Sequence, residues 1–268
     1  MKKEIAKEAW MDILSDYYNE TEKNDIPNPI IERWRRFHYY GRIKLVNEML
    51  NIETKEMFLD CGCGTGERLA LYENNCLTYG IDISNRYCNI AKNKTLNSLV
   101  IRGDLEHLPF KNESYEVCVM VYTFVYMLNK EKVFEEIHRV LKKKGRLVIF
   151  DPNSLSLRTF LRKLQLKFRI FWKNDIGSEI NKKLVTSQSL NYFGFQKLAL
   201  KTGFKIDNWC GNFETIPFPM FMKPPLKQIT LFFFWLWEKM KCNKWGKIPI
   251  IMIFSDFLII KIIKNDKG

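Results

Sequence analysis

An acid and three glycines stand close together in the stretch MFLDCGCGTGE, residues 57–67: Asp60, Gly62, Gly64 and Gly66. The short apolar run before them predicts a buried strand. Nucleotides bind to α/β sheets where a loop leaves the end of a parallel strand and enters a helix. Glycine lets such a loop turn tightly and lie flat against a ligand. The stretch therefore predicts a nucleotide site.

The spacing of the glycines narrows the kind of nucleotide. A dinucleotide fingerprint needs a third glycine three residues after the second, and that position holds Glu67. The spacing therefore disfavours a nicotinamide oxidoreductase. A phosphate-binding P-loop would need a following Gly-Lys-Ser/Thr, and none is present here.

Two more acids end predicted strands, Asp82 in YGIDIS and Asp104 in IRGDLEHLPF. With them, the pattern strand-Asp-x-Gly-x-Gly-x-Gly resembles the first motif of class I S-adenosylmethionine-dependent methyltransferases. The stretches 109–120, 133–153 and 190–206 resemble later passages of the same family. The resemblance is strong over about residues 45–151 and weaker over 187–210, and it is closest to ubiquinone-pathway and similar small-molecule methyltransferases.

The resemblance implies a role for several residues in binding S-adenosylmethionine. Asp60 would lie near the methionine portion, Asp82 would accept hydrogen bonds from the ribose hydroxyls, and Asp104 would face the adenine amino group. The full implied set is Asp60, Gly62, Gly64, Gly66, Asp82, Ile83, Asp104, Leu105 and Tyr122. Cys61 and Cys63 occupy positions that the family fills with small residues, so we interpret them as packing residues.

Short β-branched runs alternate with helical segments from residue 57 onward, which favours parallel βαβ units. We place strands at 57–61, 79–83, 98–102, 115–122, 146–151, 204–210 and 257–264, and helices at 66–74, 84–94, 130–143 and 187–202. Together with the resemblance, this predicts an α/β, Rossmann-like sheet of order 3-2-1-4-5-7-6 with only the last strand antiparallel. We expect a helical N-terminal cap over 1–50 and a methyltransferase domain over 51–268, with lid insertions at about 154–185 and 217–249.

Composition restricts the partners and the cellular location that we expect for the protein. The chain has a formal net charge of +13, which favours anionic partners or reflects a generally basic surface. Seven scattered cysteines, without a C-x-x-C pair, predict reduced thiols in a cytoplasmic protein and no metal site. The apolar runs 229–237 and 248–263 are shorter than the roughly 20 residues of a spanning helix, so we expect no membrane crossing.

Methyl transfer requires the acceptor to lie in line with the sulfonium methyl group, so alignment is the main contribution of a protein. A base is needed only where the acceptor must lose a proton. Tyr126 and Asp151, near the ends of the fourth and fifth predicted strands, are the candidate bases. The acceptor atom, oxygen, nitrogen, carbon or sulfur, stays open.

Leu and Phe recur at helical spacing over 154–172, with Arg and Lys between them, as in an interfacial basic helix. With the apolar 217–239 stretch, this favours a small lipid-like or lipid-linked acceptor and peripheral attachment to the inner, anionic membrane surface. A lid packed on the core explains the pattern equally well. Two alternatives stay open: an RNA or other nucleic-acid methyltransferase, and a non-catalytic partner subunit that binds S-adenosylmethionine.

Overall fold

The structure is a computed structural model that describes residues 43–156, 189–212 and 255–265. Seven strands form one sheet: β1 (Met57–Cys61), β2 (Leu77–Asp82), β3 (Leu99–Arg102), β4 (Tyr115–Val121), β5 (Leu141–Pro152), β6 (Phe204–Asn212) and β7 (Phe257–Lys264). Their order is β3-β2-β1-β4-β5-β7-β6, and β7 alone runs antiparallel to its neighbours. The order predicted from the sequence is therefore confirmed, including the direct parallel pairing of β1 with β4.

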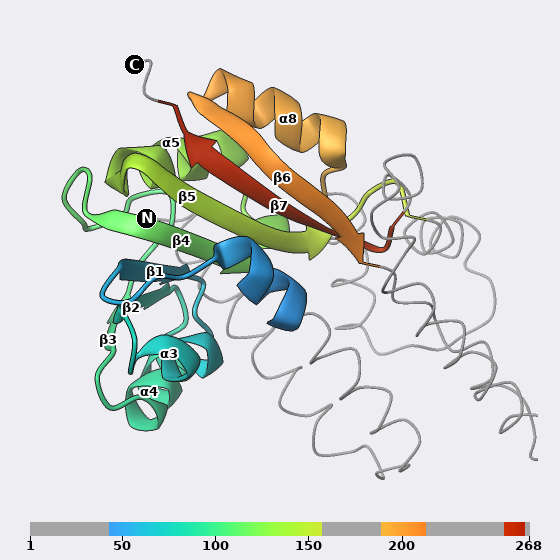
Figure 1. Ribbon diagram of the computed structural model, residues 1–268. Helices are drawn as coiled ribbons and strands as arrows, with labels where there is room; N and C mark the ends of the chain where they lie inside the picture. Colours follow the sequence, from blue (N-terminus) through green and yellow to red (C-terminus); the bar gives the residue numbers. More distant parts are fainter. Residues whose placement is uncertain (1–42, 157–188, 213–254, 266–268) are drawn as a thin grey trace, which may run out of the picture.

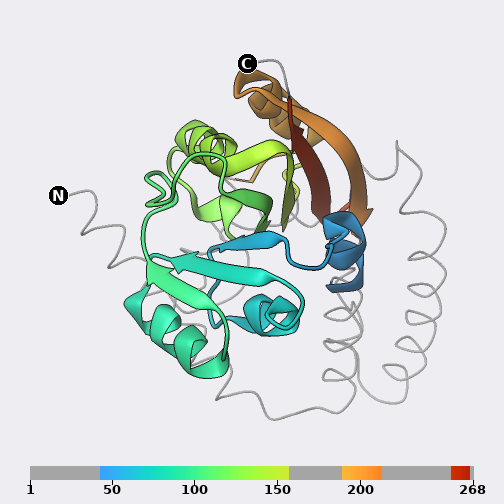
Figure 2. The same cartoon turned by 60° about the vertical axis from the view of Figure 1, so that its left-hand side comes forward.

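Helices cover both faces of this sheet (Figures 1 and 2). Helices α5 (Lys130–Val140) and α8 (Tyr192–Lys201) pack on one face. Helices α3 (Glu67–Tyr72) and α4 (Asn85–Lys94), with a helical segment at 43–50, pack on the other. Every parallel strand of the centre is thus buried on two sides, which explains its continuous apolar sequence.

Helix starts are fixed by the side chains before them. In α4, α5 and α8 the residue preceding the helix accepts a hydrogen bond from a backbone N–H in the first turn, which satisfies one of the unpaired donors there. These capping residues are Ser84, Asn129 and Asn191. The caps hold α4 and α5 in the positions that follow β2 and β4, the strands whose ends carry the predicted site.

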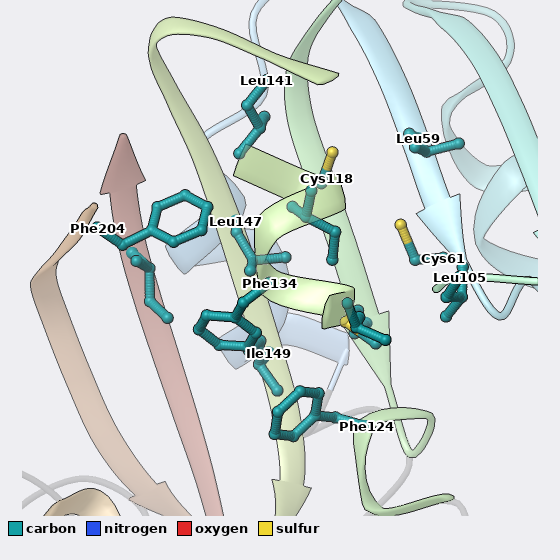
Figure 3. Packing of buried hydrophobic residues seen from close by; sticks show 14 of the residues in the cluster. Leu59, Cys61, Leu105, Cys118, Phe124, Phe134, Leu141, Leu147, Ile149 and Phe204 are labelled. Atoms are coloured by element: carbon teal, nitrogen blue, oxygen red, sulfur yellow. The ribbon is translucent and has the colours of Figure 1, made fainter. Parts of the chain in front are cut away.

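On the α5 side of the core, aromatic rings pack among aliphatic side chains (Figure 3). Phe134 lies 5.2 Å from Phe124 and 5.7 Å from Phe204, measured between ring centroids. All three side chains are fully buried. Phe124 belongs to the 3-10 turn η1 (Phe124–Tyr126), which directly follows the end of β4. The core therefore fixes the turn beside which an acceptor is expected.

Arg146 on β5 joins the helical segment at 43–50 to the sheet. Its guanidinium donates to the carbonyl oxygens of Leu50 and Asn51 and forms a two-pronged ion pair with Glu56 at 2.8 and 2.7 Å. Carbonyl groups at a helix C-terminus lack partners within the helix, and Arg146 supplies them. The 43–50 helix is thereby held against the face of the sheet that carries α3.

The structure departs most from the predicted boundaries at the starts of β5 and α8. Strand β5 begins at Leu141, not 146, because Leu141 pairs with Tyr115 ahead of a bulge. Helix α8 begins at Tyr192, not 187, and η1 was not predicted. The cap is described only from residue 43. The 154–172 segment is described only to 156, and the 217–249 insertion lies outside the described residues. Within the described ranges, no helix is long and apolar enough to span a bilayer.

Candidate functional site

The three glycines after β1 all adopt left-handed backbone conformations. Their φ angles are +80° at Gly62, +52° at Gly64 and +79° at Gly66. Residues with a Cβ rarely adopt this region, so glycine is required by the path of the loop itself. The N–H groups of Gly62 and Cys63 donate to the carbonyl of Ile81 at 2.8 and 3.1 Å, which ties the loop to β2.

Only one of these glycines leaves room for a ligand. A Cβ on Gly62 would collide with the side chain of Thr123, and a Cβ on Gly66 would lie 2.9 Å from that of Ala91. At Gly64 no heavy atom of the described residues lies within 4 Å of that position. The sequence predicted that all three glycines lie flat against a ligand, but only Gly64 has the space for this. Gly62 and Gly66 are needed for packing inside the protein. We call the open space at Gly64 the cradle.

Asp82 is joined to this cradle by hydrogen bonds. Its Oδ2 accepts from the N–H of Gly64 at 2.9 Å, and its Oδ1 accepts from the N–H of Ser84 at 2.9 Å. Burial raises the pKa of the Asp82 carboxyl, and the amide donors act in the opposite direction by favouring the charged form. The amide of Ile83 acts on the carboxylate as well. Two carboxylate oxygens have about four acceptor positions, so room for a further hydrogen bond from a ligand remains.

The loop after β3 presents Asp104 and Leu105. Asp104 is half-buried, and its Oδ1 accepts from the N–H of Glu106 at 3.0 Å, while Leu105 is packed into the core. Arg139 of α5 donates to the carbonyls of Leu108 and Phe110 at 2.8 and 2.7 Å, which fixes the rest of the loop. The topology brings the ends of β1, β2 and β3 to one edge of the sheet, so all three predicted acids meet there.

Asp60 has a partner that the sequence analysis missed. Arg68, in the first turn of α3, donates from Nε to Oδ2 at 3.0 Å and from Nη2 to Oδ1 at 3.1 Å. Burial raises the pKa of Asp60, and the guanidinium opposes that rise. The sequence did contain a signal for this pair. Arg68 lies two residues after Gly66, at the start of the helix that follows the strand ending in Asp60.

Tyr122 and Thr123 directly follow β4, next to the glycine loop. Tyr122 has φ +55°, which is unusual for a residue with a side chain, and its ring packs edge-on against Phe150 at 5.0 Å and Phe257 at 5.3 Å. The hydroxyl of Thr123 lies 3.5 Å from the carbonyl oxygen of Gly62. The β4 end and the loop are therefore in direct contact, as a shared site requires.

The two candidate bases have different surroundings. Tyr126 is half-buried in η1 and packs against the core. Asp151 is fully buried, and neither carboxyl oxygen has a hydrogen-bond partner among the described residues. Burial raises the pKa of Asp151 well above its ordinary value, although the ammonium of Lys130 and the amide of Val125, which approaches the carboxyl without completing a hydrogen bond, oppose this rise. A carboxyl that keeps its proton can donate a hydrogen bond but does not start as a base.

The cysteines of the loop are buried free thiols. A hydrogen bond with Cys118, followed by burial, raises the pKa of Cys61 well above its ordinary value. Burial likewise raises the pKa of Cys63. Nucleophilic and metal-binding cysteines react as thiolates, which such surroundings disfavour. This agrees with their interpretation as packing residues.

Residues 59–149, which run from β1 into β5, match the family model described as "Methyltransferase domain". This match falls on the strands and loops that carry the glycine cradle and all three acids. Residues 59–149 form a methyltransferase domain, and the sheet has the fold of class I S-adenosylmethionine-dependent methyltransferases. S-adenosylmethionine is accordingly its cofactor, and the open position at Gly64, with a carboxylate beside it, fits that nucleoside.

Individual relatives agree with this placement. An uncharacterized protein from Methanocaldococcus jannaschii, MJ1252, is 29% identical over 162 residues, which cover 58% of this chain and 63% of that protein. The demethylmenaquinone methyltransferase of Thermotoga maritima is 28% identical over 58% of this chain and 68% of its own length. A solved structure of an S-adenosylmethionine-dependent methyltransferase from Thermotoga maritima has a TM-score of 0.58 at 18% identity and covers 96% of this chain and 100% of that one.

Proposed function

We propose that this chain transfers the methyl group of S-adenosylmethionine to a small lipid-like or lipid-linked acceptor. One observation supports methyl transfer most strongly. The glycine loop has open space at Gly64, and the N–H of Gly64 donates a hydrogen bond to Asp82, so the loop and the acid form one unit. A nucleoside seated there would place its ribose against Asp82 and its base toward Asp104 and Leu105.

The residues of this site supply alignment. When bound, S-adenosylmethionine provides an electrophilic methyl group on a positively charged sulfur. Holding acceptor and methyl group in line converts an encounter in solution into a step within one complex, which accounts for a large part of the rate gain in such reactions. The contact of Thr123 with Gly62 and the packing of Tyr122 on Phe150 fix the region between the loop and the end of β4, where the acceptor would approach.

Two observations support an acceptor of lipid character. The demethylmenaquinone methyltransferase related to this chain is named for a quinone whose bulk is hydrocarbon. The sequence at 154–172 combines an apolar repeat with interspersed cations, a composition suited to a lipid-like molecule or to the surface of a membrane.

Label transfer tests this function. The full chain is incubated with methyl-labelled S-adenosylmethionine and, separately, with a lipid extract, a soluble metabolite extract and total RNA from cells lacking the gene. We expect label in the lipid fraction, and none with the Asp82→Ala variant. Label in RNA alone or in soluble metabolites alone would overturn the proposed acceptor. Binding of S-adenosylhomocysteine without label in any fraction would point to a non-catalytic subunit instead.

A further inference from the structure

Arg68 reaches from α3 across to the end of β1 and forms a two-pronged ion pair with Asp60. The N–O distances are 3.0 and 3.1 Å. The Asp60 side chain is completely buried, whereas that of Arg68 stays 24% exposed. The pair therefore has a buried negative end and a positive end that solvent or a ligand can reach.

The guanidinium keeps binding capacity beyond this pair. Arginine has five N–H donors, and the bonds to Asp60 use one on Nε and one on Nη2. Among the described residues, three donors remain without a partner, two of them on Nη1. A planar guanidinium matches a second carboxylate well, because it can offer two parallel donors to it.

The positive charge of Arg68 acts on two acids of the site, Asp60 and Asp82. Its positive charge counters the burial that raises the pKa of Asp60, and it acts in the same direction on Asp82. Arg68 stands in the first turn of α3, which begins directly after Gly66, and Asp82 is bonded to the N–H of Gly64 in the same loop. If the ribose of a nucleoside contacts Asp82, the group attached to that ribose would extend toward Arg68.

We infer that Arg68, oriented by Asp60, binds the carboxylate at the amino-acid end of the cofactor. This rests on the proposed function, which puts S-adenosylmethionine in the cradle. The amino-acid end carries a carboxylate, and the part-exposed guanidinium of Arg68 is the group of the pair that can receive it. Asp60 acts as a positioning residue for Arg68, and Arg68 distinguishes a complete cofactor from a nucleoside without the amino-acid end.

The test compares two ligands that differ in this end. S-adenosylhomocysteine carries the amino-acid group, and 5′-methylthioadenosine lacks it, so the full chain is titrated with each by calorimetry. A charge-assisted hydrogen bond implies that Arg68→Gln weakens S-adenosylhomocysteine by about 10- to 100-fold. Binding of 5′-methylthioadenosine should stay unchanged. Lys201→Gln, which removes an exposed cation on α8, is the control and should alter neither ligand.

Equal weakening of both ligands in Arg68→Gln would overturn the inference, since a general distortion of the loop affects any nucleoside. Unchanged S-adenosylhomocysteine binding would overturn it as well. A parent chain that binds neither ligand would instead refute the proposed function.

A second variant covers the case in which Arg68→Gln does not fold, because it leaves the Asp60 charge buried without its partner. Arg68→Lys keeps one positive charge but loses the planar fork. We expect it to weaken S-adenosylhomocysteine selectively, by less than Gln would, and to leave 5′-methylthioadenosine unaffected. Equal losses for the two ligands in this variant would again contradict the assignment.

Discussion

The Oδ2 atom of Asp82 accepts a hydrogen bond from the backbone N–H of Gly64 at 2.9 Å. The acid at the end of β2 and the glycine loop after β1 therefore form one unit, although they are separated in sequence by a helix. The loop conformation and the carboxylate position depend on each other. A change in either is expected to alter cofactor binding, and the two kinds of change are distinguishable.

Gly64→Val should abolish cofactor binding and leave most of the fold intact. The new side chain would fill open space in the cradle, and the left-handed backbone would add a strain of about 1–2 kcal/mol. Gly62→Ala is the matched comparison, because its methyl group would meet Thr123 and should lower the melting temperature more. The measurements are thermal unfolding and S-adenosylhomocysteine titration. A normal cofactor complex in Gly64→Val would refute the cradle.

Asp151→Asn should change how stability depends on pH. Burial raises the pKa of Asp151 in the folded chain, so the folded state keeps a proton that the unfolded state releases above about pH 4. Asp151 thus contributes stability at low pH that is lost as pH rises toward its folded pKa. The Asn variant lacks this loss and should gain stability relative to the parent between pH 5 and pH 8.

Unfolding of parent and variant at these two pH values, followed by circular dichroism, checks this expectation. Asp207→Asn removes an exposed carboxyl on β6 and serves as the control. Lys130 is the cation that faces Asp151, and it is the same in parent and variant, so the difference between them isolates the carboxyl. A difference that stays constant from pH 5 to pH 8 would mean that Asp151 is ionised in the folded chain.

The strands were predictable from the sequence because apolar runs and their spacing are local properties, whereas the strand order also needed the resemblance to the methyltransferase family. The sequence also identified Asp60, Asp82 and Asp104, since strand ends follow from the same runs. The partners of these acids were not accessible in this way. Arg68 meets Asp60 only once α3 packs on β1, and Thr123 meets Gly62 only once β4 lies beside β1. The early start of β5 was hidden because residues 141–143 continue the pattern of the preceding helix and were assigned to it.

The basic 154–172 segment gives a prediction that rests on its sequence pattern, because it is described only to residue 156. If it contacts anionic lipid, each cation near the surface contributes about 1 kcal/mol. The full chain should then sediment with anionic vesicles at low salt and be released at high salt. Combining Arg158→Gln, Arg162→Gln and Lys163→Gln should release it at low salt without weakening S-adenosylhomocysteine. Failure of the parent to bind such vesicles would remove the membrane surface as a partner.

The most direct test of the central claim is a calorimetric titration of the full chain with S-adenosylhomocysteine and with NAD, repeated for Asp82→Ala. We expect one site for S-adenosylhomocysteine, none for NAD, and an affinity lower by about 10- to 100-fold in the variant, as the loss of a charge-assisted hydrogen bond implies. Asp207→Ala, which removes an acid from β6, should bind like the parent. Absence of S-adenosylhomocysteine binding, or equal affinity in parent and Asp82→Ala, would contradict the account.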